Sequence, residues 1–151
     1  MKKYLLLPML LLIVFLSGFS APPQDTFLVE RVVDGDTIKL ANGERVRYLG
    51  IDTPETKHPT KPVQYFGPEA YQANKKLVQG KIVRLEFDGQ KKDKYDRLLA
   101  YVYVDDIFVN AWLVKNGFAK VLTYPPNVKK TASLLKLQQK AKEAGIGLWG
   151  K

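Results

Sequence analysis

The sequence contains no cysteine and a single histidine. Without cysteine the chain has no disulfide, no thiolate metal site, no cysteine nucleophile and no cysteine for lipid attachment. The one histidine, His58, precedes a proline in a loop; we expect it to be exposed and not a ligand, so a Ser-His-Asp triad has no basis. A Gly-x-Gly-x-x-Gly fingerprint and a P-loop are also missing from the sequence. Hydrolysis by this chain would therefore have to use carboxylates and a metal ion.

The length of 151 residues leaves room for one domain with a real core. The 24 basic and 15 acidic residues give a formal charge of +9. Such an excess favours polyanionic partners, either nucleic acid or an anionic membrane surface. A soluble protein without such a partner can have the same balance, so charge alone leaves both interpretations open.

The N-terminus has the pattern of a secretory signal. Lys2 and Lys3 precede the uncharged stretch Tyr4–Phe19, and small residues follow. We predict a signal peptide over residues 1–20, or to 21, then a short linker over 21–25 and one domain over 26–151. The protein is then secreted; an uncleaved membrane anchor is the alternative, although the stretch is shorter than the about 20 residues of a comfortable span.

The domain is predicted to be α+β and mainly β. Alternating and β-branched residues predict five strands, at Phe27–Val33, Thr37–Leu40, Arg45–Ile51, Lys81–Phe87 and Leu98–Val104. About three helices are expected: one from Pro68 to Gly80, one over Asn110–Asn116, and one marked by the stripe Leu134, Leu137, Ala141 and Ala144. Five strands with a helix between the third and fourth predict a Greek-key barrel of the OB type.

Two acidic clusters lie at predicted strand ends, Asp34-Gly35-Asp36-Thr37 and Asp52-Thr53-Pro54-Glu55. If the meander brings Asp36 and Asp52 together, their oxygens suit a hard cation such as Ca²⁺. Glu55 could then hold and deprotonate a water molecule beside the metal. Each cluster alone is also explained by turns and caps.

Two arginines could meet a phosphate. Arg47 lies on the third strand and Arg97 precedes the fifth, and a guanidinium offers a planar fork of donors. Five residues of straight strand span ~16 Å, so we expect Arg47 not to touch Asp52 directly. As isolated residues, both arginines are also compatible with an ordinary solvated surface.

Basic and aromatic residues flank these clusters. Lysines near the second arginine (Lys91, Lys92, Lys94) and in the first long loop (Lys57, Lys61) would attract a phosphate backbone without reading sequence. Tyr95 and Tyr124 are possible stacking surfaces for bases, whereas Tyr101 and Tyr103 share a strand face and are compatible with packing alone.

Taken together, these motifs resemble the staphylococcal nuclease (thermonuclease) family over roughly residues 27–149. The resemblance rests on the following segments: Val33–Leu40, Arg47, Ile51–Pro59, Gly67–Ala70, Asp93–Arg97, Ala100-Tyr101, Val109-Asn110 and Ala119–Val121.

The resemblance implies an OB-type barrel and a Ca²⁺-dependent nuclease that hydrolyses phosphodiester bonds of DNA and RNA, with single strands expected. It implies cleavage of the 5′ phosphorus–oxygen bond, leaving 3′-phosphate products. Its implied site residues have the following roles: Asp36, Asp52 and the Thr53 carbonyl as calcium ligands, Asp34 beside them, Glu55 as activator of water, Arg47 and Arg97 on the scissile phosphate, Lys94 and Tyr95 on a nucleotide phosphate, and Tyr124 on a base.

Two segments depart from the family pattern. Asp96 stands where the type member has glycine, and Leu122–Asn127 offers one tyrosine where the type member has two. Asp96 puts phosphate affinity in doubt, and the altered segment puts base preference in doubt. The main alternative function is a non-catalytic OB-fold module that binds nucleic acid; a second is an anchored envelope protein with structural calcium. We expect a monomer because no coiled-coil seam is present.

Overall fold

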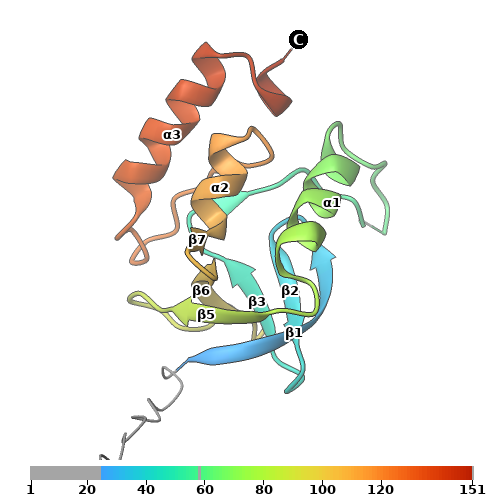
Figure 1. Cartoon of the computed structure of the whole chain (residues 1–151), viewed down its shortest axis with the longest axis vertical. Coiled ribbons are helices and arrows are strands. Elements are labelled where there is room, and N and C mark those ends of the chain that lie inside the picture. The colour runs from blue at the N-terminus through green and yellow to red at the C-terminus, as the bar shows by residue number, and fades with distance from the viewer. Residues whose placement is uncertain (1–24, 58, 151) are drawn as a thin grey trace, which may run out of the picture.

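The computed structural model describes residues 25–57 and 59–150. The predicted signal peptide lies outside the described residues, as do residues 21–24 of the predicted linker and His58. Within the described ranges, no helix is both long and apolar enough to cross a membrane. Figure 1 shows a barrel of strands with the helices packed over one end of it.

The barrel consists of five strands, which are β1 (Thr26–Asp34), β2 (Thr37–Leu40), β3 (Arg45–Tyr48), β5 (Ile82–Glu86) and β6 (Leu98–Val104). β1, β2 and β3 form an antiparallel meander, and β5 pairs antiparallel with both β1 and β6. A parallel pairing of β3 with β6 closes the barrel. Register shifts in the pairing of β1 with β2 allow β1 to bend, so that it pairs with β2 on one side and with β5 on the other. The predicted five-stranded OB-type barrel is confirmed.

Three helices cover the barrel: α1 (Gly67–Val78), α2 (Val109–Lys115) and α3 (Thr131–Glu143), followed by a short 3₁₀ helix at Gly147–Trp149. All three lie where the sequence predicted them, with ends shifted by a few residues. α1 packs on β1, while α2 packs against β6 and α3. Three two-residue strands complete the fold: β4 (Ile51–Asp52), β7 (Ile107–Phe108) and β8 (Lys120–Val121).

The third strand is shorter than predicted, and this difference shapes the site. β3 ends at Tyr48, and the chain turns at Leu49-Gly50 before Ile51 starts β4, which pairs with β8. Gly50 has φ +75°, a left-handed conformation that favours glycine. A side chain at Gly50 would also meet Leu134 of α3, whose Cδ1 atom would lie 2.8 Å from the added Cβ. The prediction of one continuous strand to Ile51 was wrong because alternation of apolar residues does not show this turn.

A buried asparagine ties the same turn to the barrel. Asn110, at the start of α2, is fully buried and donates from Nδ2 to the Leu49 carbonyl at 2.8 Å. Its Oδ1 accepts from the Val102 N–H at 2.9 Å. Because a buried amide must find partners, these two bonds fix the path of the chain between Arg47 and Asp52.

Candidate active site

A cleft of about 200 Å³ opens beside the ends of β1, β3 and β4. The cleft is lined by the residues that were predicted to bind the metal, to activate water and to hold the scissile phosphate. These residues are Asp34, Asp36, Asp52, Thr53, Glu55, Arg47 and Arg97. Arg45 and Lys57 add further positive charge. The structure therefore brings together residues from four separate segments of the chain.

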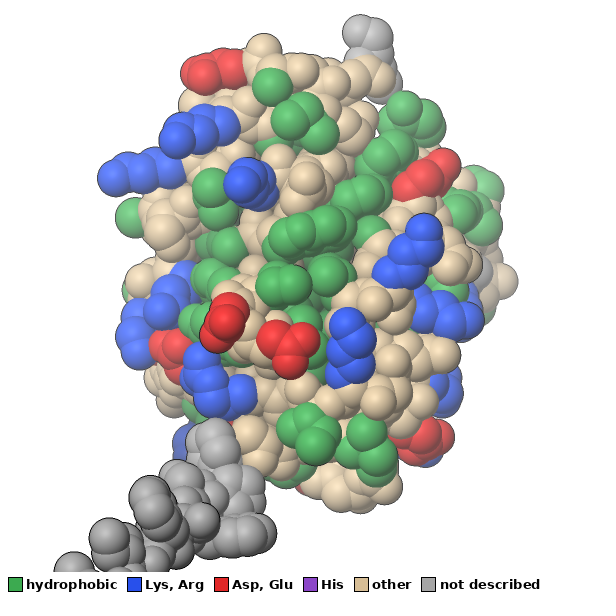
Figure 2. All heavy atoms as spheres, in the orientation of Figure 1, with side chains coloured by type: hydrophobic (Ala, Val, Ile, Leu, Met, Phe, Trp, Pro, Cys, Tyr) green, Lys and Arg blue, Asp and Glu red, His purple; other side chains and the backbone are tan. Residues whose placement is uncertain are grey.

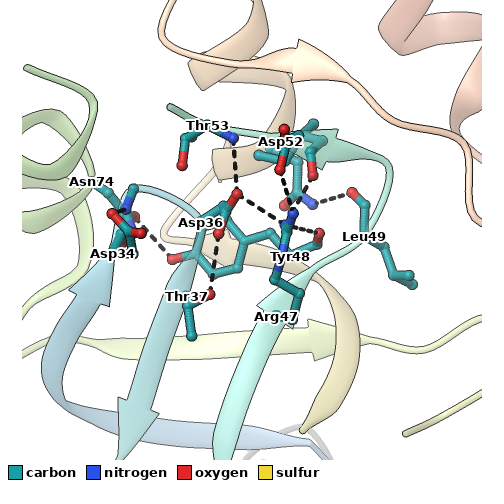
Figure 3. A network of polar contacts seen from close by, with 12 residues as sticks. Asp34, Asp36, Thr37, Arg47, Tyr48, Leu49, Asp52, Thr53 and Asn74 are labelled. Carbon is teal, nitrogen blue, oxygen red and sulfur yellow. Dashed lines mark hydrogen bonds and ion pairs between the residues drawn. The ribbon is translucent and has the colours of Figure 1, made fainter. Parts of the chain in front are cut away.

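Asp36 is the most buried carboxylate of the cleft, with 5% of its surface exposed. It accepts hydrogen bonds from the Thr37 hydroxyl at 3.1 Å and from the Thr53 N–H at 2.9 Å. Its Oδ2 lies 3.1 Å from the Arg47 guanidinium, as Figure 3 shows. Burial raises the pKa of Asp36, while the charge of Arg47 and the Thr53 N–H offset part of that rise.

Arg47 joins the two acidic clusters. Its Nη2 donates to Asp52 Oδ1 at 3.0 Å, and its Nη1 donates to the Tyr48 and Ile51 carbonyls at 3.0 and 2.9 Å. The expectation that Arg47 cannot touch Asp52 was wrong. It assumed a straight strand, whereas the turn at Leu49-Gly50 folds Asp52 back over the arginine (Figure 3).

Glu55 and Asp34 lie at the other wall of the cleft. Asp34 accepts from the Thr56 hydroxyl at 2.8 Å, and Glu55 Oε1 accepts from the Lys57 N–H at 3.0 Å. A hydrogen bond with the Asp34 carboxyl group raises the pKa of Glu55, and partial burial adds to the rise. A carboxylate with a raised pKa is a stronger base, which suits the abstraction of a proton from water.

Arg97 is oriented by Asp93, a residue to which the sequence analysis gave no role. Arg97 Nε and Nη2 both lie 2.8 Å from Asp93 Oδ2, and the backbone N–H groups of Tyr95 and Arg97 donate to Oδ1. Burial alone would raise the pKa of Asp93, but these bonds outweigh it and lower the pKa from its ordinary value. The sequence did contain a signal for this role of Asp93. An aspartate often opens a tight turn by accepting hydrogen bonds from the N–H groups that follow it, and Tyr95 and Arg97 follow Asp93 by two and four residues.

Replacing Asp93 with asparagine should destabilise the protein at neutral pH. The lowered pKa means that the ionised carboxylate stabilises the fold above the unfolded-state value of 3.8, and this contribution is lost as pH falls through the lower folded-state pKa. Urea unfolding of both proteins should show a difference in unfolding free energy that is constant near pH 7 and shrinks below about pH 4. Asp96→Asn is the control. The Asp96 side chain is 81% exposed, and within the described residues Lys92 is its one ion-pair partner. A difference for Asp93→Asn that persists unchanged at low pH would contradict this assignment.

A second pocket of about 190 Å³ adjoins the cleft and shares Arg47 and Arg97 with it. The three residues predicted to bind substrate, Lys94, Tyr95 and Tyr124, all line this pocket. Leu122 and Leu99 supply apolar walls, which the sequence analysis did not assign. Tyr95 is 60% exposed, and the Lys94 ammonium lies over its ring, 5.1 Å from the ring centroid. The pocket offers an aromatic and apolar surface next to two arginines.

The donor set at the cleft fits a hard cation. Asp36, Asp52 and the Thr53 carbonyl are oxygen donors of the kind that Ca²⁺ prefers, and the Asp52 side chain is 42% exposed, so ions and water reach it. Thr53 Oγ1 is buried without a hydrogen-bond partner and lies against Gly35, the residue before Asp36. In the part of the chain that the structure describes, no three His, Cys, Asp or Glu side chains converge on one point. A cation here would therefore take two carboxylates and complete its shell with the carbonyl and water.

Comparison with known proteins identifies the family. A family model described as "Staphylococcal nuclease homologue" matches residues 45–151. The chain is 44% identical over 128 residues to the thermonuclease of Staphylococcus intermedius, covering 83% of this chain and 76% of that protein. It is 39% identical over 136 residues to the thermonuclease of Staphylococcus hyicus, covering 88% of this chain and 80% of that protein.

A third relative is longer than this chain. The SPbeta prophage-derived endonuclease YokF of Bacillus subtilis (strain 168) is 48% identical over 128 residues, covering 82% of this chain and 43% of that protein. The chain thus spans less than half the length of that relative. The barrel, the cleft and the identity over most of the chain agree: this chain belongs to the staphylococcal nuclease family.

Proposed function

We propose that this protein is a secreted, calcium-dependent nuclease that hydrolyses phosphodiester bonds of DNA and RNA. The observation that carries the proposal is the single cleft in which Asp36, Asp52 and Glu55 face Arg47 and Arg97. Relatives named thermonuclease and endonuclease support it. Export rests on the sequence pattern of residues 1–20.

Asp36, Asp52 and the Thr53 carbonyl would hold calcium, with Asp34 beside them. When bound, the ion supplies a Lewis acid for a phosphate oxygen and its water. Glu55 accepts a proton from the attacking water, since its raised pKa brings it closer to the pH at which it works. The guanidinium groups of Arg47 and Arg97 donate to the phosphate oxygens whose charge grows during the reaction. Scission of the 5′ phosphorus–oxygen bond leaves a 3′-phosphate.

The second pocket is an argument for a preference for single-stranded substrates. Lys94, beside the Tyr95 ring, supplies a positive charge for a phosphate, and Tyr124, which is 39% exposed, offers a ring face for one base. A base enters such a pocket only when it is not paired and stacked in a duplex. We therefore expect single strands to be cut faster than duplexes.

Replacing Glu55 with glutamine should abolish cleavage and leave binding intact. Glutamine keeps the size of the side chain but accepts no proton, so we expect kcat to fall about 10³-fold. The assay follows single-stranded DNA with Ca²⁺ or with a chelator, and fluorescence anisotropy measures binding in parallel. Glu143→Gln, on α3 outside the residues that line the cleft, is the matched control.

Three outcomes separate the alternatives. Calcium-dependent cleavage that only Glu55→Gln loses supports the nuclease and the role of Glu55. Binding without cleavage by the unaltered protein leaves a non-catalytic nucleic-acid-binding module. Full activity of Glu55→Gln would remove this residue from the mechanism while keeping the enzyme.

A further inference from the structure

Two lysines, one of which was predicted only to attract the phosphate backbone, lie around one aromatic ring at the edge of the cleft. The Nζ atoms of Lys57 and Lys75 lie 5.3 and 5.9 Å from the ring centroid of Tyr71. Tyr71 and Lys75 are four residues apart on α1, so they share one face of that helix. The ring packs against the barrel core, which fixes its position.

Neither ammonium group forms an ion pair with any carboxylate among residues 25–57 and 59–150. By contrast, Lys39, Lys92 and Lys129 each reach a carboxylate within 4 Å. The Tyr71 ring attracts both ammonium groups and so holds two positive charges at the edge of the cleft without a carboxylate partner. A phosphate diester has the negative charge and the acceptor oxygens to bind such groups.

The position of this cluster relates it to the cleft. Lys57 lines the cleft that holds Arg47 and Arg97, but it does not line the second pocket with Tyr95 and Tyr124. Arg47 and Arg97 line both the cleft and the second pocket. They therefore lie between the second pocket and the cluster formed by Lys57, Tyr71 and Lys75. The loop that follows β4, which carries Lys57, runs beside α1 in Figure 1. A strand with one base in the pocket and its phosphate at the arginines would continue toward Tyr71.

We propose that Lys57, Tyr71 and Lys75 form a second phosphate subsite, which binds a neighbouring nucleotide's phosphate in single-stranded nucleic acid. The subsite rests on the proposed nuclease function and extends it to substrate length. Because the Lys57 N–H donates to Glu55 Oε1 at 3.0 Å, a strand held here also contacts the segment that positions Glu55. Long strands are therefore better substrates than a dinucleotide, which has no second phosphodiester to place at the subsite.

Positive charge alone does not distinguish the region of Lys57 and Lys75 from other parts of the surface. Figure 2 shows Lys and Arg side chains over α3 as well as over α1, with a band of hydrophobic side chains between them. Lys136 and Lys140 are exposed on α3 and line neither the cleft nor the second pocket. A double substitution there changes the net charge by the same amount as one at Lys57 and Lys75, so it is the matched control.

The test compares Lys57→Gln/Lys75→Gln with Lys136→Gln/Lys140→Gln. On single-stranded DNA of about 12 nucleotides, we expect the first variant to lower kcat/KM about tenfold, as the loss of two charge contacts near the surface would. On a dinucleotide the first variant should lose at least about threefold less kcat/KM than on the longer strand, and the α3 variant should stay within about twofold of the unaltered protein on both substrates. The salt dependence of binding to the longer strand, measured by anisotropy in chelator, should fall by about 1.4 in slope, since each single-strand phosphate contact contributes about 0.7.

The outcomes distinguish this proposal from the nuclease function. If the unaltered protein binds DNA but does not cut it, the nuclease function fails, and the salt slopes in chelator still decide the subsite. Equal losses on the dinucleotide and the longer strand would overturn the subsite, as would a slope change in the α3 variant equal to that at Lys57 and Lys75.

Discussion

Replacing Arg47 with lysine should lower kcat/KM about 10⁴-fold, in the range expected for an arginine that stabilises a phosphoryl-transfer transition state. Lysine keeps the charge but has one donor atom in place of a fork. It cannot reach Asp36, Asp52 and the two carbonyls that Arg47 contacts at once. The measurement is cleavage of single-stranded DNA at saturating Ca²⁺, with Arg97→Lys for comparison. A loss of less than about tenfold would show that charge alone suffices at this position.

The same residue also stabilises the fold, and Arg47→Met separates the two roles. Methionine removes the cation from a side chain that is only 15% exposed and leaves Asp36 buried without it. Breaking such a pair costs about 3–5 kcal/mol. The pKa of Asp36 is already raised, so protonation removes the buried charge as pH falls, and the destabilisation should be greatest at neutral pH and shrink in acid. Urea unfolding as a function of pH checks this; a cost independent of pH would contradict it.

Replacing Gly117 with alanine should destabilise the fold by about 4 kcal/mol, which places it among the most severe single substitutions. Gly117 has φ +71°, and an added Cβ would overlap the Ile146 carbonyl oxygen, a backbone atom with little freedom to move. The Gly117 carbonyl also accepts from the Leu148 N–H at 2.9 Å, so the overlap would break the attachment of the C-terminal segment to α2.

Gly80 provides the control for this effect. It has nearly the same φ, +72°, but an added Cβ meets no atom within 4 Å. Gly80→Ala should therefore cost only the left-handed strain, about 1–2 kcal/mol. Thermal unfolding of both variants measures the difference; equal losses would show that φ and not the close backbone approach governs Gly117.

Local patterns were sufficient to predict where the barrel strands lie, apart from the end of the third strand. Val83 and Leu85 alternate with exposed neighbours in β5, and β6 was predicted from Leu98 to Val104 as observed. The sequence also indicated that Asp36 and Asp52 could meet, because both belong to short motifs next to strand ends, and Glu55 follows Asp52 by three residues. These features depend on neighbours within a few residues.

The contacts within the site depend on distant segments, and sequence patterns did not show them. The turn at Gly50 is packed by Leu134 from α3 and held by Asn110 from α2. Only this turn allows Arg47 to reach Asp52. The role of Asp93 was missed for a different reason: its ion pair is local, but an acidic residue in a charged loop is usually solvated.

The parallel pairing of β3 with β6 has a consequence for when the chain gains activity. In this pairing Arg47 lies opposite Leu99, and Arg97 comes directly before β6. Before the two strands meet, each arginine is on a segment that has no fixed position relative to the other. Cutting ability and barrel closure would then be gained in one step, and a chain that is still unfolded would not cut the nucleic acids around it.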